Sequence, residues 1–393
     1  MNARVLFVDH TAVLGGGELS LRDICARSGA AGAVLLLSDG PFRGLLESAG
    51  VPVQVLELGG SLRAVRRDGA GRSAAAAAGL AAATWKLTRV ARGFDLVYAN
   101  SQKAFVISAL AARLARRPVI RHLRDILSEE HFDRGNIRLV TRLANLCATR
   151  VIANSRATAA AFMEQGGRAD KVRVVHNGID PTDFARVTEA DVATVRGELG
   201  GRGCPLVGVF GRFHPWKGQH VAMDVLARLP GVHGLFVGDA LFGEQDYVAQ
   251  VRSQARELGL EERVHFLGFR SDIPRLMRAV DIVLHTAEAP EPFGRVLVEA
   301  MLAGRPVVTG RAGGAVEIVV EGETGLLVTP GDVEGYAAAV RSLLADPERR
   351  AALGAAGAQR AVREFSLDAM VRGVSEEMEA ATTGRGPRIA AVT

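Results

Sequence analysis

A loop in the second half of the chain carries two cations between glycines. The segment GRFHPWKG, residues 211–218, follows an apolar run that predicts a β-strand and contains Arg212 and Lys217. Ligands of open parallel sheets bind outside the carboxyl ends of the strands, so this position favours a ligand contact. A guanidinium offers a planar pair of donors and an ammonium a point charge, which together suit a diphosphate. The alternative is a solvated loop.

Two glutamates stand further along the chain, in EPFGRVLVEA. Pro292 and Gly294 should break regular structure, which predicts a helix from near Gly294 with Glu291 in the preceding loop and Glu299 on the helix. A carboxylate only accepts hydrogen bonds, so it can hold vicinal hydroxyls of a sugar or ribose, while the N–H groups of residues 293–296 can face phosphate. The alternative is that Glu299 pairs with a nearby arginine.

The first half carries a glycine loop and a histidine. Glycines 15–17 follow the first expected strand and precede a helix expected to open at Glu18 or Leu19. Such glycines let the backbone approach a ligand, and the first N–H groups of a helix can bind an anion. The dinucleotide fingerprint G-x-G-x-x-G is not met, because position 20 is a serine. His122 follows another expected strand, where it is either structural or a ligand contact.

Repeated β–α units must position these residues. Short runs rich in Val, Leu and Ile alternate with longer amphipathic or alanine-rich segments. The strands expected in the first half are 4–8, 34–37, 53–57, 96–99, 119–121, 150–153 and 172–175. Those expected in the second half are 206–210, 235–237, 264–267, 282–284, 306–309 and 325–328. Each half therefore reads as a doubly wound α/β domain.

The length of 393 residues predicts two domains. We expect a first domain over 1–180, a linker over 181–204, a second domain over 205–365, a helix over 366–382 that crosses back to the first domain, and a flexible tail over 383–393. The longest charge-free stretch, 73–85, is shorter than the roughly 20 residues that a membrane span needs. Asp9 and His10 interrupt any leader-like run, so we expect a cytoplasmic location. The three cysteines fit neither a disulfide framework nor a zinc site: Cys25, Cys147 and Cys204.

The net charge of +5 conceals an asymmetry. Residues 1–180 carry +10 and the remainder −5. Aromatic residues make up only 5% and are not interleaved with arginines, which disfavours nucleic acid. The segment 74–92, with Trp85 and Lys86, could rest on anionic lipid at the inner face of a membrane, unless the basic excess is only a composition bias. The basic clusters are Arg63, Arg66, Arg67 and Arg72; Arg113, Arg116, Arg117, Arg121 and Arg124; and Arg134, Arg138 and Arg142.

Taken together, these motifs resemble the retaining glycosyltransferases of family 4. The resemblance rests on GRFHPWKG, on the E-x7-E element from Glu291 to Glu299, and on VDHTAVLGGGELSL, VIANSRATAAAF, VHNGID, VHFLGFRSDIPRLMRAVDIVL and AGGAVEIVVEGETGLLVTPGD. It extends over nearly the whole chain. It implies a GT-B architecture, in which two Rossmann-like domains face each other across a cleft. It also implies that the domain over 1–180 binds the acceptor and the domain over 205–365 binds the nucleotide sugar.

The resemblance also implies a nucleotide-diphosphate sugar as donor, with UDP or GDP as the nucleotide, and a role for each matching residue. Arg212 and Lys217 would hold the diphosphate, Glu299 the ribose and Glu291 the sugar ring. The remaining expected donor contacts are the backbone at Phe293 and Gly294, with Arg295 and Val296; Gly268 and Phe269 near the base; and Gly16 and Gly17 over the phosphates. His122 would lie near the anomeric carbon, and Glu18 and Arg124 would contact the acceptor.

Metal and nucleophile are both missing from the sequence pattern. No Asp-x-Asp pair occurs, so we expect no metal and no other cofactor, with cations replacing the metal. No carboxylate is expected beneath the anomeric carbon, which favours same-face attack assisted by the departing phosphate over double displacement. The expected acceptor is a lipid-linked or glycan acceptor in cell-envelope or exopolysaccharide synthesis.

Other functions remain open at this point. One is glycosylation of a specialised metabolite such as an aminocyclitol. Another is a GT-B-fold sugar-nucleotide isomerase, which would need no acceptor. A sugar phosphorylase would need a cofactor lysine, and the chain has only four: Lys86, Lys103, Lys171 and Lys217. A non-catalytic sugar-binding protein would be expected to lose Lys217 or Glu291, and both are present.

Overall fold

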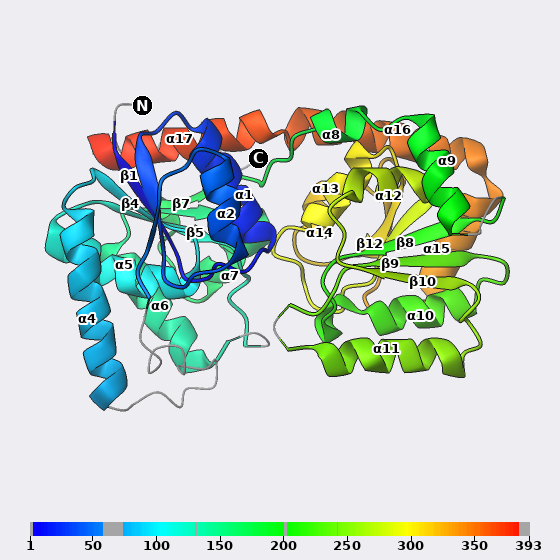
Figure 1. Cartoon of the computed structure of the whole chain (residues 1–393), viewed down its shortest axis with the longest axis horizontal. Coiled ribbons are helices and arrows are strands. Elements are labelled where there is room, and N and C mark those ends of the chain that lie inside the picture. Colours follow the sequence, from blue (N-terminus) through cyan, green and yellow to red (C-terminus); the bar gives the residue numbers. More distant parts are fainter. Residues whose placement is uncertain (1–2, 58–73, 130–131, 200–202, 242, 385–393) are drawn as a thin grey trace. The chain divides into compact units, whose positions relative to one another are not determined.

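The chain divides into two compact units in the computed structural model (Figure 1). The first unit is Met1–Gly178 with Leu367–Thr393, and the second is Ile179–Ser366. The structure describes residues 3–57, 74–129, 132–199, 203–241 and 243–384. The expected arginine cluster at 63–72 and most of the expected tail lie outside these ranges.

The sheet of the first unit is parallel throughout, in the order β3-β2-β1-β4-β5-β6-β7. Its strands are β1 (Val5–Asp9), β2 (Gly32–Leu36), β3 (Val53–Val55), β4 (Leu96–Ala99), β5 (Val119–Leu123), β6 (Arg150–Ala153) and β7 (Val172–Val174). The strand order reverses between β1 and β4. Ligands of such sheets bind at the carboxyl edge beside a reversal of this kind.

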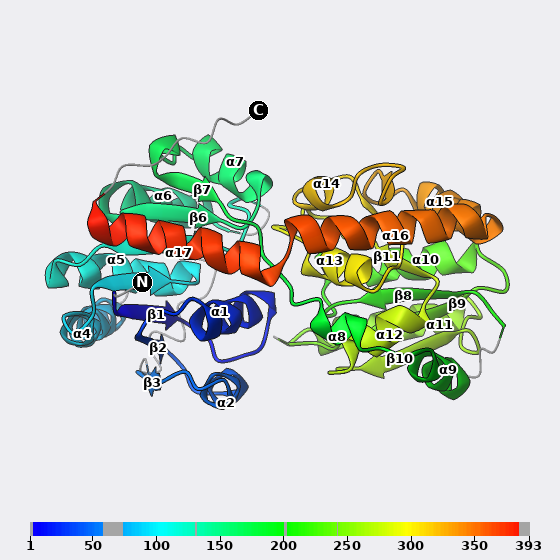
Figure 2. The same ribbon diagram turned by 90° about the horizontal axis from the view of Figure 1, so that it is seen from above.

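Helices cover both faces of this sheet. One face packs against α4 (Ala74–Ala91), α5 (Gln102–Ala115), α6 (Arg134–Cys147) and α7 (Arg156–Glu164). The other packs against α1 (Gly16–Arg27), α2 (Pro41–Ser48) and α17 (Leu367–Thr383), and Figure 2 shows α17 lying along the sheet. Leu6 and Val8 point into the first core while Val5 and Phe7 point into the second, as strand alternation requires.

The second unit repeats this plan with six parallel strands, in the order β10-β9-β8-β11-β12-β13. They are β8 (Leu206–Phe210), β9 (His233–Val237), β10 (Val264–Gly268), β11 (Ile282–His285), β12 (Val307–Gly310) and β13 (Gly325–Val328). The order reverses between β8 and β11. One face packs mainly against α10 (Gln219–Ala227), α11 (Gln245–Glu257) and α15 (Val333–Ala345). The other packs mainly against α12 (Ile273–Ala279), α13 (Arg295–Leu302), α14 (Ala315–Ile318) and α16 (Pro347–Glu364).

Every expected strand is present, and the expected two-domain parallel α/β fold is confirmed. The segment 181–204 differs from the linker that its polar composition predicts. It contains α8 (Thr182–Ala185) and α9 (Glu189–Glu198), and Phe184 and Val195 are buried in the core of the second unit. A capping box between Thr188 and Asp191 begins α9. Each of these short helices has a single buried residue, so composition does not reveal them.

Candidate active site

The loop after β8 is fixed by close backbone contacts. Gly211 and Gly218 have φ angles of +132° and +67°, in the region that favours glycine. A Cβ on Gly218 would lie 2.0 Å from the carbonyl oxygen of Thr286, just beyond β11. The Thr286 hydroxyl donates to the Gly218 carbonyl at 2.6 Å. Lys217 is therefore held at the edge where β8 and β11 separate.

Lys217, Glu291 and His285 meet at this edge. The Lys217 ammonium pairs with Oε1 of Glu291, and Nε2 of His285 lies 3.0 Å from the same oxygen. Nδ1 of His285 lies 3.0 Å from the hydroxyl of Thr309. Glu291 is only 6% exposed. Burial alone would raise the pKa of Glu291, but Lys217 and His285 lower this pKa by more than burial raises it, so that it falls to about 2. The carboxylate is therefore ionised at neutral pH.

Trp216 brings the two predicted cations to one ring. The Lys217 ammonium lies 4.3 Å from the centroid of the Trp216 ring, and the Arg212 guanidinium carbon lies 5.8 Å from the ring centroid. Cations in this range are attracted by the ring quadrupole. The structure thus groups Arg212, Lys217 and Glu291, three of the residues singled out in the sequence.

Helix α13 begins as the sequence predicts. Gly294 is its N-cap, with φ +100°, and Arg295 is its first residue. Nε of Arg295 donates to Oε1 of Glu299 at 2.9 Å. Burial raises the pKa of Glu299, although Arg295 opposes the change. The arginine pairing considered as an alternative is therefore present, and the ribose contact of Glu299 stays a prediction.

Two glycines hold the loop before α13 in place. A Cβ on Gly313 would lie 2.3 Å from the carbonyl oxygen of Glu291, and one on Gly314 would lie 2.5 Å from that of Phe293. The Phe293 ring is buried against Phe365, so any ligand contact must come from its backbone. The sequence contains this signal in AGG, but only the fold shows which loop it supports.

The other predicted donor residues lie on two elements of the second unit. Gly268 ends β10 with φ +65°, and the side chain of Phe269 is 66% exposed. Val296 is in the first turn of α13 and is half-buried. The exposed ring of Phe269 is free of burial in the core, and its place near the base, which the resemblance implies, stays a prediction.

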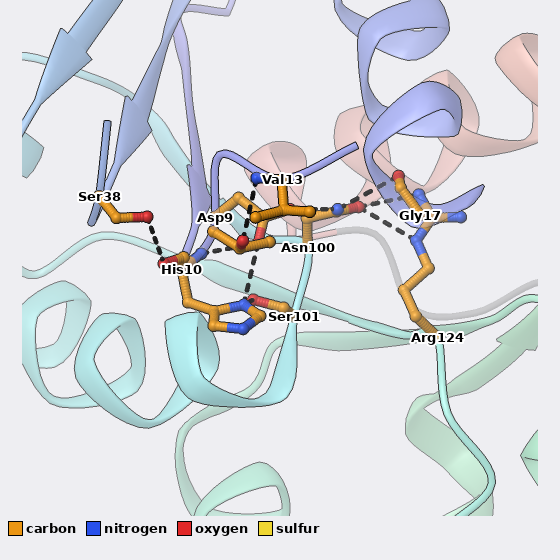
Figure 3. A network of polar contacts seen from close by, with 9 residues as sticks. Asp9, His10, Val13, Gly17, Ser38, Asn100, Ser101 and Arg124 are labelled. Atoms are coloured by element: carbon orange, nitrogen blue, oxygen red, sulfur yellow. Dashed lines mark hydrogen bonds and ion pairs between the residues drawn. The ribbon is translucent and has the colours of Figure 1, made fainter. Parts of the chain in front are cut away.

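A polar network fills the corresponding edge of the first unit (Figure 3). Asp9 ends β1 and is fully buried. Its Oδ2 accepts from the Asn100 amide at 2.6 Å, and its Oδ1 lies 3.3 Å from Nδ1 of His10. That same nitrogen lies 2.8 Å from the hydroxyl of Ser101. Burial raises the pKa of Asp9, but contacts with His10, Asn100 and Ser101 lower it below its usual value.

The glycine loop joins this network through Arg124 and Asn100. The Asn100 amide also donates to the Gly17 carbonyl at 3.3 Å. Arg124 donates to Oδ1 of Asn100 at 2.8 and 3.1 Å and to Oδ1 of Asn177 at 2.7 Å. Helix α1 begins at Gly16, earlier than predicted, because the glycines themselves adopt its first turn. Gly17 and Arg124 are therefore close together, and the phosphate and acceptor contacts expected for Gly16, Gly17 and Arg124 stay predictions.

Glu18 lies in the first turn of α1 and is half-buried. Burial raises its pKa to about 7, and the neighbouring charge of Asp9 acts in the same direction. A carboxyl that titrates near neutrality can both donate and accept hydrogen bonds under working conditions. This property suits the predicted contact with an acceptor.

The structure does not place His122 at the carboxyl end of its strand. Strand β5 continues to Leu123, two residues beyond the predicted end, so His122 lies inside the sheet and is 1% exposed. Its Nδ1 is hydrogen-bonded to the Tyr98 hydroxyl, and burial lowers its pKa well below the usual value. Arg124, two residues on, occupies the strand end that we expected for His122.

Arg121 departs from the predicted basic surface. Its guanidinium is buried, lies 5.0 Å from the ring centroid of Phe105 and 5.6 Å from that of Phe162, and donates to the Val140 carbonyl at 3.0 Å. Burial lowers its pKa to about 9. Arg121 therefore supports the core and adds no charge to the surface.

Sequence reasoning missed the functional potential of several polar residues in both units. They are Asp9, His10, Asn100, Ser101, Asn177 and His285. Asp9 and His10 were used only to argue against a leader. The available signal was position, because Asp9–His10 and Asn100–Ser101 each follow directly on an expected strand, and ligands of open parallel sheets bind outside the carboxyl ends of strands.

Two searches of the described residues bear on metal and membrane. None of the described residues form a group of three or more His, Cys, Asp or Glu side chains that could hold a metal ion. Within the same ranges, no helix combines the length and hydropathy needed to cross a bilayer.

Comparisons with known proteins agree with this geometry. Residues 15–178 match the glycosyl transferase 4-like domain, and residues 201–360 match the glycosyl transferases group 1. The crystal structure of Anabaena HepE in complex with UDP-glucose is 42% identical, with a TM-score of 0.88, over 96% of this chain and 100% of that one. HepE has also been solved with UDP and with UDP and glucose.

Curated relatives include two bacterial enzymes. The lipopolysaccharide core biosynthesis glycosyltransferase LpsE of Rhizobium meliloti (strain 1021) is 36% identical over 42% of this chain and 47% of its own length. The D-inositol 3-phosphate glycosyltransferase of Corynebacterium glutamicum (strain R) is 28% identical over 85% of this chain and 78% of its own. The chain spans about half the length of the first curated relatives that it matches.

The match to HepE extends over its whole length, and the two family models cover both units. The chain therefore belongs to the family 4 glycosyltransferases of the GT-B fold.

Proposed function

We propose that this enzyme transfers a hexosyl group from a UDP-sugar to an acceptor hydroxyl with retention of configuration. The observation that carries the proposal is the grouping of Arg212, Lys217 and Glu291 where β8 and β11 separate. HepE, which has been solved with UDP-glucose, supports UDP-glucose as the first donor to test. GDP-glucose is the comparison donor.

The residues of the second unit divide the work by charge. Arg212 and Lys217 neutralise the diphosphate as it leaves. Glu291 already accepts contacts from Lys217 and His285 on one oxygen, so it acts as a hydrogen-bond acceptor for the sugar rather than as a nucleophile. The acceptor oxygen forms its bond to the anomeric carbon on the face from which the phosphate departs. The departing phosphate takes the acceptor proton.

Three measurements test this chemistry. UDP-glucose should raise the melting temperature more than GDP-glucose at the same concentration, because the ligand that binds more tightly stabilises the folded state more. A ligand at 100 Kd stabilises by about 2.7 kcal/mol. Proton NMR of the product should show the α-anomer from an α-linked donor. Transfer should continue in EDTA. An inverted product, a trapped glycosyl–enzyme adduct, or activity that EDTA abolishes and Mg²⁺ restores would overturn the corresponding part of the proposal.

We further propose an anionic, lipid-linked or glycan acceptor of the cell envelope. The basic excess of the first half supports an anionic acceptor, and LpsE acts in lipopolysaccharide core biosynthesis. Inositol phosphate glycosyltransferases among the relatives make a cyclitol phosphate the second acceptor class to test. Turnover of UDP-glucose to an isomer without any acceptor would instead indicate an isomerase. Binding without any turnover would indicate a sugar-binding protein.

Helices α4, α5 and α6 support peripheral contact of the first unit with anionic membranes. They pack side by side and contain no Asp or Glu. Their exposed residues combine apolar and cationic side chains, the composition of interfacial helices. These residues are Trp85, Lys86 and Arg89 on α4; Leu110, Arg113 and Leu114 on α5; and Arg138, Leu139, Arg142 and Leu146 on α6.

Vesicle flotation tests this surface. The protein should float with phosphatidylglycerol-containing vesicles and not with pure phosphatidylcholine, and added salt should release it. Trp85→Ser combined with Leu114→Ser should reduce flotation, whereas Val362→Ser, at an exposed apolar residue of the second unit, should not. Equal flotation of all variants would exclude these helices as the contact.

A further inference from the structure

His10 lies at the point where the strand order of the first unit reverses. It follows β1, and Ser101 follows Asn100 at the end of β4, so the two residues flank the point where the strand order reverses. No other strand of the sheet lies between these two residues, because β1 and β4 are paired neighbours. This is the position at which open α/β sheets bind ligands.

The surroundings of His10 fix both the ring orientation and its tautomer. Nδ1 faces Oδ1 of Asp9 at 3.3 Å and the Ser101 hydroxyl at 2.8 Å. The backbone N–H of His10 also donates to Oδ1 of Asp9 at 2.6 Å, and the Ser38 hydroxyl donates to the His10 carbonyl at 3.3 Å. A buried carboxylate beside Nδ1 favours the proton on that nitrogen. Nε2 then carries a lone pair.

The other side of the ring remains accessible. The His10 side chain is 34% exposed, whereas Asp9 beneath it is fully buried. Within the described ranges, Nε2 of His10 has no hydrogen bond. Figure 3 shows the ring at the margin of the network, with Nδ1 turned inward. The arrangement presents an oriented acceptor for an O–H group.

We propose that Nε2 of His10 accepts a hydrogen bond from a hydroxyl of the sugar substrate, and that Asp9 and Ser101 are the positioning residues for this contact. The inference rests on the proposed function, because it assumes a polyol ligand at the first unit. The hydroxyl belongs either to the acceptor or to the hexose of the donor. The contact orients the hydroxyl and moves no proton.

Three substitutions at position 10 separate this contact from a structural role. His10→Ala removes both nitrogens. His10→Asn keeps an amide donor near Nδ1 but nothing at the place of Nε2, and His10→Gln puts an amide oxygen near that place. His233→Gln, in the second unit, is the control. Isothermal titration measures binding of UDP and UDP-glucose, and UDP release measures transfer to methyl α-glucoside and to myo-inositol.

All three variants should bind UDP within about twofold of wild type. The alanine and asparagine variants should lose roughly three- to tenfold in the sugar-dependent quantity, as expected for one neutral hydrogen bond, and the glutamine variant should regain most of the loss. Weaker binding of UDP-glucose assigns the hydroxyl to the donor hexose. Unchanged UDP-glucose binding with a raised KM for the alcohol assigns it to the acceptor.

Two results would overturn the inference. One is an asparagine variant that equals wild type in all sugar-dependent quantities. The other is an equal loss in all three variants together with a lowered melting temperature, which would show a structural role. Failure of the wild-type protein to bind UDP would instead contradict the proposed function and leave these results distinguishable.

Discussion

Each unit has a carboxylate–histidine pair at the carboxyl edge of its sheet, where the strand order reverses. The carboxylate orients the histidine in one pair, and the histidine supports the carboxylate in the other. In the first unit the buried Asp9 orients the partly exposed His10. In the second, the buried His285 helps to fix the ionised Glu291, which also meets Lys217. One edge therefore presents an imidazole and the other presents paired charges. A common fold supplies the position, but only the carboxylate is buried in the first unit, whereas both members of the pair are buried in the second.

Replacing Lys217, in the site of the second unit, should have the largest effect on activity. Lys217→Ala removes the ammonium that stabilises the leaving diphosphate and also leaves Glu291 without its cation. We expect kcat for UDP release to fall by about 100-fold or more. Lys86→Ala, on the exposed face of α4, should retain wild-type rates. A near-normal rate for Lys217→Ala would remove this lysine from the catalytic machinery.

Replacing His285 tests whether a buried histidine tunes the carboxylate. His285→Ala removes a hydrogen bond that lowers the pKa of Glu291, so this pKa should rise from about 2. UDP release at neutral pH should fall by roughly tenfold. The acid limb of the pH–rate profile should shift upward, because the carboxylate becomes protonated at higher pH. An unshifted limb would show that Lys217 alone sets the charge of Glu291.

Replacing Glu18 should produce the smallest change, in the pH dependence of stability. The folded pKa of about 7 lies above the ordinary value of 4.5, so the folded state binds more protons between these values. Stability from this group is complete below the ordinary pKa and is lost as pH rises through about 7. Glu18→Gln should lose about 1–3 kcal/mol less than wild type between pH 5 and pH 8 in urea unfolding. Parallel pH profiles would contradict the shift.

The sequence predicts the second site better than the first for a physical reason. Arg212 and Lys217 belong to one loop, and Glu291 and Glu299 to one loop–helix element, so local spacing reveals them. Asp9, Asn100 and Arg124 come from three separate strands, and only strand order brings them together.

Strand ends limit the prediction further. A strand that ends two residues later than expected moves His122 from the ligand edge into the core. The contact between His285 and Glu291, the carboxylate that Lys217 also pairs with, could not be predicted from the sequence either. His285 follows directly on the strand expected over 282–284 and ends the observed β11, and nothing in the sequence pairs it with Glu291.

Because of helix α17, the two units differ in when they can complete their cores during synthesis. The core of the first unit includes Leu367, Met370, Val374 and Met378, which the ribosome adds after all of the second unit. The second unit is continuous from Ile179 to Ser366 and can complete its own core as soon as it has emerged. The half of the enzyme that is translated first therefore has one sheet face covered only by α1 and α2 until its last helix has been synthesised.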